Sequence, residues 1–208
     1  MSAGGAGWDV IRETKEPWQT EEFGTSHRGR PGAVLADGTE PKSVVFDVGS
    51  GTVMHETSDW WVYDGQTLRA PLATALRGSC SCGWRGTTSY RIDWQQAAAE
   101  GPEWYDTTGP HDDWTQHITD VENRAVPIPE DVTALLTQLR TRLGVLADDA
   151  PLAALRILTV LEHPLAETAE AATFAAQADG QSWDTIATGL GLTAQDARTR
   201  LHRYARGY

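Results

Sequence analysis

Residues 42–94 show the alternation of apolar and polar positions that predicts short strands. The runs SVVFDV and TVMHE flank the turn former GSG, WWVY and QTLRA flank Asp64 and Gly65, and LRGSCSC precedes GWRG. Gly-containing turns between β-branched or aromatic runs are typical of hairpins. We therefore expect a small antiparallel sheet in this region.

From residue 109 onward the apolar residues recur at steps of three and four, which predicts helices. A first helix ends before Pro127, and its apolar stripe consists of Trp114, Ile118, Val121 and Ala125. A second begins after Pro129 and carries Val132, Leu135, Leu136, Leu139, Leu143 and Leu146. The run after Pro151 is apolar nearly all round, so we expect it to be central, and an alanine-rich helix from Pro164 to Asp179 stops at Gly180.

These patterns predict an α+β fold in three parts. Residues 1–41 are rich in Gly, Glu, Thr and Pro without periodicity and are expected to form a flexible arm. Trp8, Trp18 and Phe23 are unusual in such an arm, so they could dock onto the body or onto a partner. Residues 42–126 form a β-rich domain with one helix, and residues 127–208 form an all-α bundle. No run approaches the roughly 18 apolar residues of a membrane span, so we expect a cytoplasmic protein.

Residues 182–206 have the pattern of a helix-turn-helix. Ser182 can cap a short helix, Gly191 permits a sharp turn, and Thr193 with Asp196 resembles a capping box for a second helix. The apolar positions that close the motif are Trp183, Ile186, Ala187, Leu190 and Leu192. The second helix of such a unit can enter the major groove of DNA.

This segment resembles the helix-turn-helix of region 4 in bacterial sigma factors, at Ile186-Ala187, Leu190-Gly191, Thr193 and the Arg200-Leu201-His202-Arg203 run. No second sigma region is evident upstream, so the chain is not identified as a sigma factor. The resemblance implies that the second helix faces DNA. A protein that binds DNA in this way is expected to be associated with the nucleoid. The residues expected to contact DNA are Thr193, Gln195, Arg198, Thr199, Arg200 and Arg203.

Charge supports a local basic surface at the C-terminus. The chain has a formal net charge of −12, which disfavours binding of phosphates by the protein as a whole. The final 18 residues reverse this balance, since they hold four arginines and only Asp196 as an acid. DNA contact is the interpretation we favour. A helix-turn-helix that serves only packing, or contact with another protein, remains the alternative.

The only cysteines, Cys80 and Cys82, are separated by one residue. Zinc needs four ligands, and we predict Cys80, Cys82, His111 and His117, with His55 as a spare. Residues i and i+2 of a regular strand are too far apart for two sulfurs on one ion, so the backbone must bend between Ser81 and Gly83. Two reduced, packed thiols remain the alternative. A redox pair is disfavoured because no thioredoxin-like βαβ pattern surrounds it.

Eight of the nine tryptophans precede residue 115. Together with CSCGWRG, the segments Trp60 to Gly65, Ile92 to Trp94 and Gly109 to His117 resemble a tryptophan-rich family of actinobacterial proteins. That resemblance implies binding of DNA that contains 5-methylcytosine. Five tryptophans and four arginines could supply such a surface: Trp60, Trp61, Trp84, Trp94, Trp104, Arg69, Arg77, Arg85 and Arg91. Of these, Trp84 and Arg85 are the residues we expect to contact DNA. A tryptophan-rich core with ordinary surface arginines is the alternative.

No catalytic motif is present: the sequence has no P-loop, dinucleotide fingerprint, GxSxG or HExxH. The acidic pairs Asp112-Asp113 and Asp148-Asp149 lie where helix starts favour carboxylates. We therefore predict a non-enzymatic protein that binds duplex DNA, as a regulator or a reader of modified DNA, and that pairs as a homodimer. The alternative is an interaction module that docks on the transcription machinery without touching DNA.

Overall fold

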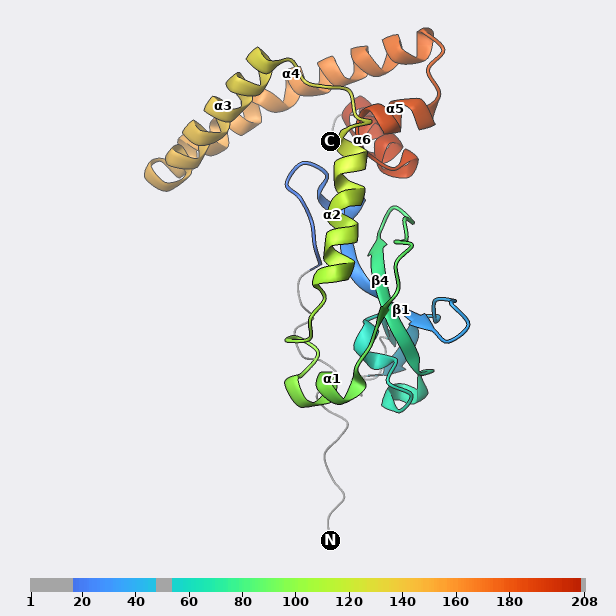
Figure 1. Ribbon diagram of the computed structural model, residues 1–208. Helices are drawn as coiled ribbons and strands as arrows, with labels where there is room; N and C mark the ends of the chain where they lie inside the picture. The colour runs from blue at the N-terminus through green and yellow to red at the C-terminus, as the bar shows by residue number, and fades with distance from the viewer. Residues whose placement is uncertain (1–16, 48–53, 207–208) are drawn as a thin grey trace. The chain divides into compact units, whose positions relative to one another are not determined.

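The computed structural model describes residues 17–47 and 54–206, and the chain divides into two compact units, Met1–Asp120 and Val121–Tyr208. The first unit holds the strands and two helices, and the second consists of helices (Figure 1). The predicted α+β class is therefore confirmed.

The first unit contains two small antiparallel sheets. The three-stranded sheet has the order β1 (Gly29–Leu35), β4 (Ala73–Cys80), β5 (Tyr90–Arg91). The two-stranded sheet pairs β2 (Val44–Asp47) with β3 (Met54–Thr57), as the hairpin pattern predicts. The GSG turn of that hairpin lies outside the described residues.

β1 lies within the segment that the sequence assigned to a flexible arm. Glycine and proline interrupt the alternation of apolar and polar residues in this strand, so the sequence of β1 alone does not predict a strand. β1 is extended because it pairs with β4. Ala33 and Val34 are buried, and so is Phe23 just upstream. Trp18 also docks on the body, because its backbone pairs with Gly29. Trp8 lies outside the described residues.

The hairpin predicted around Asp64 and Gly65 is wrong. Residues on either side form two short 3₁₀ helices, η3 (Trp60–Val62) and η4 (Thr67–Arg69), and strand pairing here is limited to an isolated bridge between Asp64 and Leu72. The Asp64 carboxylate accepts the backbone N–H groups of Gln66 and Thr67 at 2.7 and 2.6 Å, which favours a tight turn over a ladder. The core beneath comprises Trp60, Val62, Tyr63, Ala73, Leu76, Ile92 and Tyr105.

Two helices complete the first unit. Asp93 caps α1 (Trp94–Glu100) by accepting the N–H groups of Gln95 and Gln96. Helix α2 (Thr108–Glu122) packs closely on the sheet, since a Cβ atom at Gly29 would lie 2.5 Å from the Trp114 ring. Only glycine allows this approach, which brings the inner face of α2 to the end of β4.

The second unit contains α3 (Glu130–Asp149), α4 (Pro151–Ala178), α5 (Trp183–Gly189) and α6 (Ala194–Arg206). The two helices predicted on either side of Pro164 form one helix, α4, because the strong helix formers around this proline outweigh one missing hydrogen bond. Most apolar side chains of α4 are exposed, so the prediction of a central helix is wrong within this unit. Among the described residues, no helix combines the length and apolarity needed to cross a bilayer.

Candidate metal centre

Four side chains of the first unit converge in a cluster that could hold a metal ion: His27, Cys80, Cys82 and His117. Their donor atoms all lie within 4.8 Å of one another. His27 Nδ1 lies 3.3 Å from His117 Nε2 and 3.7 Å from Cys80 Sγ, and Cys82 Sγ lies 3.4 Å from His117 Nε2. Three of the four residues are buried and Cys82 is half-buried. Neither cysteine forms a disulfide.

A tight turn at the end of β4 brings the two cysteines together. The backbone N–H of Gly83 donates to the Cys80 carbonyl at 3.0 Å, and the N–H of Cys80 donates to the Trp84 carbonyl at 3.0 Å. Gly83 has φ +97°, a left-handed conformation that favours glycine. The bend that the one-residue spacing requires is therefore present between Ser81 and Gly83.

His27 enters the cluster from η2 (Gly24–His27), a short 3₁₀ helix that precedes β1. Ser81, between the two cysteines, fixes this loop. Its hydroxyl accepts the backbone N–H of Arg28 at 2.8 Å and donates toward the carbonyls of Ser26 and Thr25, at 3.0 and 3.1 Å. Its own N–H donates to the Arg28 carbonyl at 2.9 Å. The residue between the thiols thus positions the histidine.

His117 lies on the buried face of α2, beside Trp114 and Ile118. The Trp84 ring stacks on its imidazole with 4.5 Å between the centroids and 8° between the planes. Trp84 therefore fixes the orientation of the His117 ring and covers it on one side. This contact ties the cysteine turn to α2.

Hydrogen bonding between the thiols makes them inequivalent. The pKa of Cys80 is lowered, first because the Cys82 side chain hydrogen-bonds to it and then through His117 and His27. The pKa of Cys82 is raised by the same hydrogen bond and by burial. The cluster thus favours a thiolate at Cys80, the form in which sulfur binds a cation.

The structure brings together three of the four predicted ligands, and His27 occupies the place assigned to His111. The His111 ring instead packs edge-on against Trp18 with 4.9 Å between the centroids, and its Nδ1 lies 3.9 Å from the Asp112 carboxylate. His55, the spare, is exposed on β3 against Phe46. The docking suggested by the aromatic residues Trp18 and Phe23 was the signal that could have pointed to His27.

The Arg85 side chain contacts the turn that carries Cys80 and Cys82. Its Nη1 donates to the carbonyls of Cys80 and Trp84 at 3.0 and 2.8 Å, and its Nε pairs with Glu40. Arg85 and Trp84, both assigned to a DNA surface by the sequence, are therefore engaged by the protein itself. Of the other tryptophans, Trp60 is in the core, whereas Trp104 is 76% exposed.

In the second unit, α5 and α6 form the helix pair that the capping pattern predicts. Ser182 Oγ accepts the N–H of Thr185 at 3.1 Å. Thr193 Oγ1 accepts the N–H of Asp196 at 3.1 Å and donates to its carboxylate at 2.8 Å. Between the helices Gly191 has φ +62°, and the small core consists of Ala187, Leu192 and Ala197.

The exposed face of α6 carries most of the residues predicted to contact DNA: Gln195, Arg198, Thr199, Arg200 and Arg203. The Arg198 guanidinium lies 5.8 Å from the centroid of the Trp183 ring, so it also packs on α5. Thr193 is half-buried and its hydroxyl is used in the cap. Its role is therefore to start α6, whereas the arginines face solvent.

No protein-family model matches the chain, and no curated protein or solved structure matches it. Both resemblances described from the sequence stay predictions.

Proposed function

We propose that this chain is a DNA-binding protein whose first unit is stabilised by Zn²⁺ and whose α6 contacts duplex DNA. The observation that carries the DNA part is the capped α5–α6 pair, with its arginines exposed on one helix. The observation that supports zinc is the spacing of the four donor atoms.

The spacing of the cluster fits one tetrahedral ion. With Zn–N of about 2.0–2.1 Å and Zn–S of about 2.3 Å, two ligand nitrogens lie about 3.3 Å apart, and a nitrogen and a sulfur about 3.6 Å. The N–N distance between His27 and His117 is 3.3 Å, and the S–N distances are 3.4 Å for Cys82–His117 and 3.7 Å for Cys80–His27. Two thiolates and two imidazoles are a donor set that zinc favours, and four protein ligands leave no open position for a substrate. A structural role follows.

The exposed arginines of α6 suit the phosphate backbone of DNA. Arg200 and Arg203 have no ion pair among the described residues, so their charge is free for a partner. Gln195 lies near the N-terminus of α6, the end that reaches base edges in a helix-turn-helix. The net charge of −12 would limit nonspecific binding elsewhere and confine contact to this helix.

A salt titration of duplex binding tests the DNA part. We expect the full chain to bind at low salt, and the double variant Arg200→Ala/Arg203→Ala to bind more weakly, with a salt slope smaller by about 1 for each lost phosphate contact. Arg156→Ala removes an exposed arginine from α4 and serves as the control. Absence of binding at low salt, or equal binding by the α6 double variant and the control, would contradict DNA contact through α6.

We further propose that the DNA bound by this protein contains 5-methylcytosine. The support for this is the resemblance of the sequence to the tryptophan-rich family of actinobacterial proteins. A methyl group in the major groove is read by apolar contact. Binding of methylated and unmodified duplexes of the same sequence should then differ. Equal affinities would leave a DNA-binding protein that does not read the modification.

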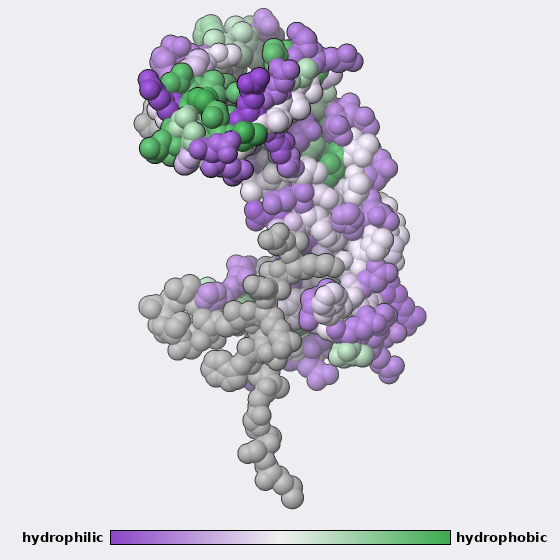
Figure 2. Space-filling model, turned by 90° about the vertical axis from the view of Figure 1, so that its left-hand side faces the viewer, coloured by the Kyte–Doolittle hydropathy of each residue, from purple (hydrophilic) through white to green (hydrophobic). Residues whose placement is uncertain are grey.

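A second candidate function is self-association through α3 and α4. Figure 2 shows apolar side chains gathered on the helical part of the molecule, and the most exposed include Leu135, Leu152, Leu155, Leu165 and Phe174. An apolar surface of this kind usually marks an interface. We propose a second copy of the chain as its partner, because a dimer would bring two α6 helices to one DNA duplex.

A further inference from the structure

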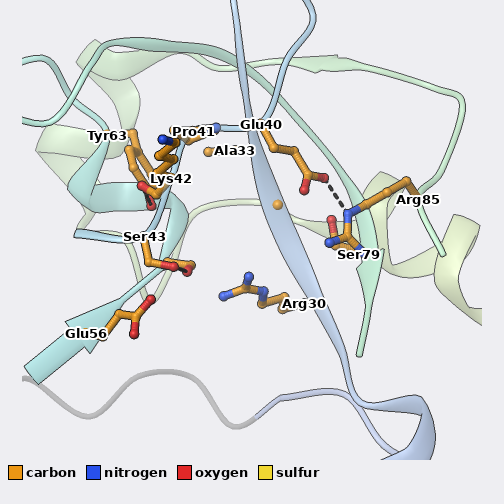
Figure 3. Close-up of a pocket in the computed structure, with 12 residues that line it drawn as sticks. Arg30, Ala33, Glu40, Pro41, Lys42, Ser43, Glu56, Tyr63, Ser79 and Arg85 are labelled. Carbon is orange, nitrogen blue, oxygen red and sulfur yellow. Dashed lines mark hydrogen bonds and ion pairs between the residues drawn. The ribbon is translucent and has the colours of Figure 1, made fainter. Parts of the chain in front are cut away.

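One face of the β1–β4 pair is hollow. In the register, Arg30 lies opposite Ser79 and Gly32 lies opposite Arg77. Cross-strand partners share a face, as do residues two apart on one strand, so these four positions are neighbours. A Cβ atom at Gly32 would collide with Ser79 Oγ, so only glycine at this position leaves room for the Ser79 hydroxyl on this face. A cavity of about 510 Å³ lies over this face and is lined by Arg30, Gly32 and Ser79 among others (Figure 3).

The cavity carries an excess of positive charge. Arg30, Lys42 and Arg85 line it, against the carboxylates of Glu40 and Glu56. Glu40 is already shared, since it pairs with Arg85 and its Oε1 lies 3.2 Å from Arg77 Nε. Within residues 17–47 and 54–206, neither Arg30 nor Lys42 makes an ion pair. Two cations are therefore available to a ligand.

A buried hydroxyl faces the same space. Ser79 is only 3% exposed, it lines the cavity, and its Oγ has no hydrogen-bond partner among the described residues. A buried hydroxyl without a partner costs free energy, which a ligand oxygen would recover. Tyr63 holds the opposite wall in place, because its hydroxyl donates to the Lys42 carbonyl at 3.0 Å.

We propose that this cavity binds a small phosphate monoester that carries hydroxyl groups, of the sugar-phosphate or nucleotide class. A guanidinium offers paired N–H donors that match phosphate oxygens, and an ammonium adds a point charge. In Figure 3 Arg30 extends into the space between Ser79 and the side chains of Ser43 and Glu56. Glu56 supplies an acceptor for a ligand hydroxyl. The volume lies within the range of roughly 300–1,000 Å³ of small-molecule sites. No described residue of α6 lines the cavity, so ligand binding here does not depend on DNA binding.

Calorimetric titration of the full chain with ribose 5-phosphate, inorganic phosphate and ribose tests the proposal. We expect saturable binding of ribose 5-phosphate, weaker binding of inorganic phosphate and none of ribose. Arg30→Ala should weaken ribose 5-phosphate binding by about tenfold or more, because it removes a charge-assisted contact. Arg91→Ala, an exposed arginine on β5, should bind as the wild type does.

Ser79→Ala distinguishes an effect on ligand affinity from an effect on the stability of the fold. It removes a buried hydroxyl without a partner, so the melting temperature should hold or rise while the affinity for ribose 5-phosphate falls. No saturation by millimolar ribose 5-phosphate overturns the proposal, as does equal binding by Arg30→Ala and Arg91→Ala. If a duplex oligonucleotide binds through Arg30 and ribose 5-phosphate does not, the cavity belongs to a DNA phosphate and the small-molecule proposal is wrong.

Discussion

The Ser81 hydroxyl accepts the backbone N–H of Arg28 at 2.8 Å, across 53 positions of sequence. This contact joins the turn that carries both cysteines to the loop that carries His27. A third distant segment joins when Trp84 stacks on His117. The candidate metal centre therefore depends on contacts around the four donor residues as well as on the donors themselves.

Replacement of Ser81 by alanine should weaken metal binding although Ser81 supplies no ligand atom. The variant loses the contacts that fix the His27 loop, so we expect zinc affinity to fall by about 10- to 100-fold, as for other groups that orient metal ligands. Competition with a chromophoric chelator measures this affinity. Ser89→Ala, an exposed serine beyond the same turn, is the matched control. Equal affinities in the two variants would contradict the role of Ser81.

Tyr63 should make stability depend on pH in the alkaline range. Burial raises the pKa of Tyr63 above its usual value of 10.0, so the folded state holds the phenol proton more tightly than the unfolded state does. The stability that this difference contributes is fully present below about pH 10 and is lost as the pH rises through the folded pKa.

Urea unfolding of the wild type and Tyr63→Phe, from neutral pH to above pH 10, measures this effect. Near neutral pH the wild type should be more stable by about 1 kcal/mol, because its hydroxyl bonds to the Lys42 carbonyl. The difference should shrink at alkaline pH. A difference that stays constant over the whole range would show that Tyr63 titrates equally in both states.

Charge on the apolar face of α3 and α4 should abolish self-association. Leu135 is 63% and Leu158 48% exposed, so Leu135→Glu and Leu158→Glu should leave the fold of the monomer intact and place a carboxylate in the interface. Light scattering after size exclusion should show a dimer for the wild type and a monomer for both variants. Gln138→Glu is the control, because it adds the same charge to α3 at a position that is already polar. A monomeric wild type would rule out the dimer.

Local signals in the sequence predicted the local parts of the fold. The caps at Ser182 and Thr193 and the turn at Gly191 involve residues within a few positions of one another, so the pattern could be seen directly. The β2–β3 hairpin was predictable for the same reason. Asp64 shows the limit of this approach, because its carboxylate forms a turn where the dipeptide Asp-Gly suggested a hairpin.

Long-range pairing accounts for what the sequence missed. β1 has two glycines and a proline, and its strand character depends on β4, whose paired residues lie 38 to 51 positions away. Because the sequence pattern of β1 is that of an arm, it gives no sign that His27 just before it lies near the cysteines. The position of His111 near the start of α2 suggests a ligand, but the helix turns its ring toward Trp18.

The zinc content of His27→Ala compared with His111→Ala tests the central claim most directly. Both variants remove one histidine from the first unit, and only His27 belongs to the cluster. Elemental analysis of purified protein should give one zinc per chain for the wild type and for His111→Ala, and substoichiometric zinc for His27→Ala. Retention of zinc by His27→Ala with loss from His111→Ala would contradict this ligand set. A wild type without zinc, whose melting temperature a chelator does not change, would contradict the metal centre itself.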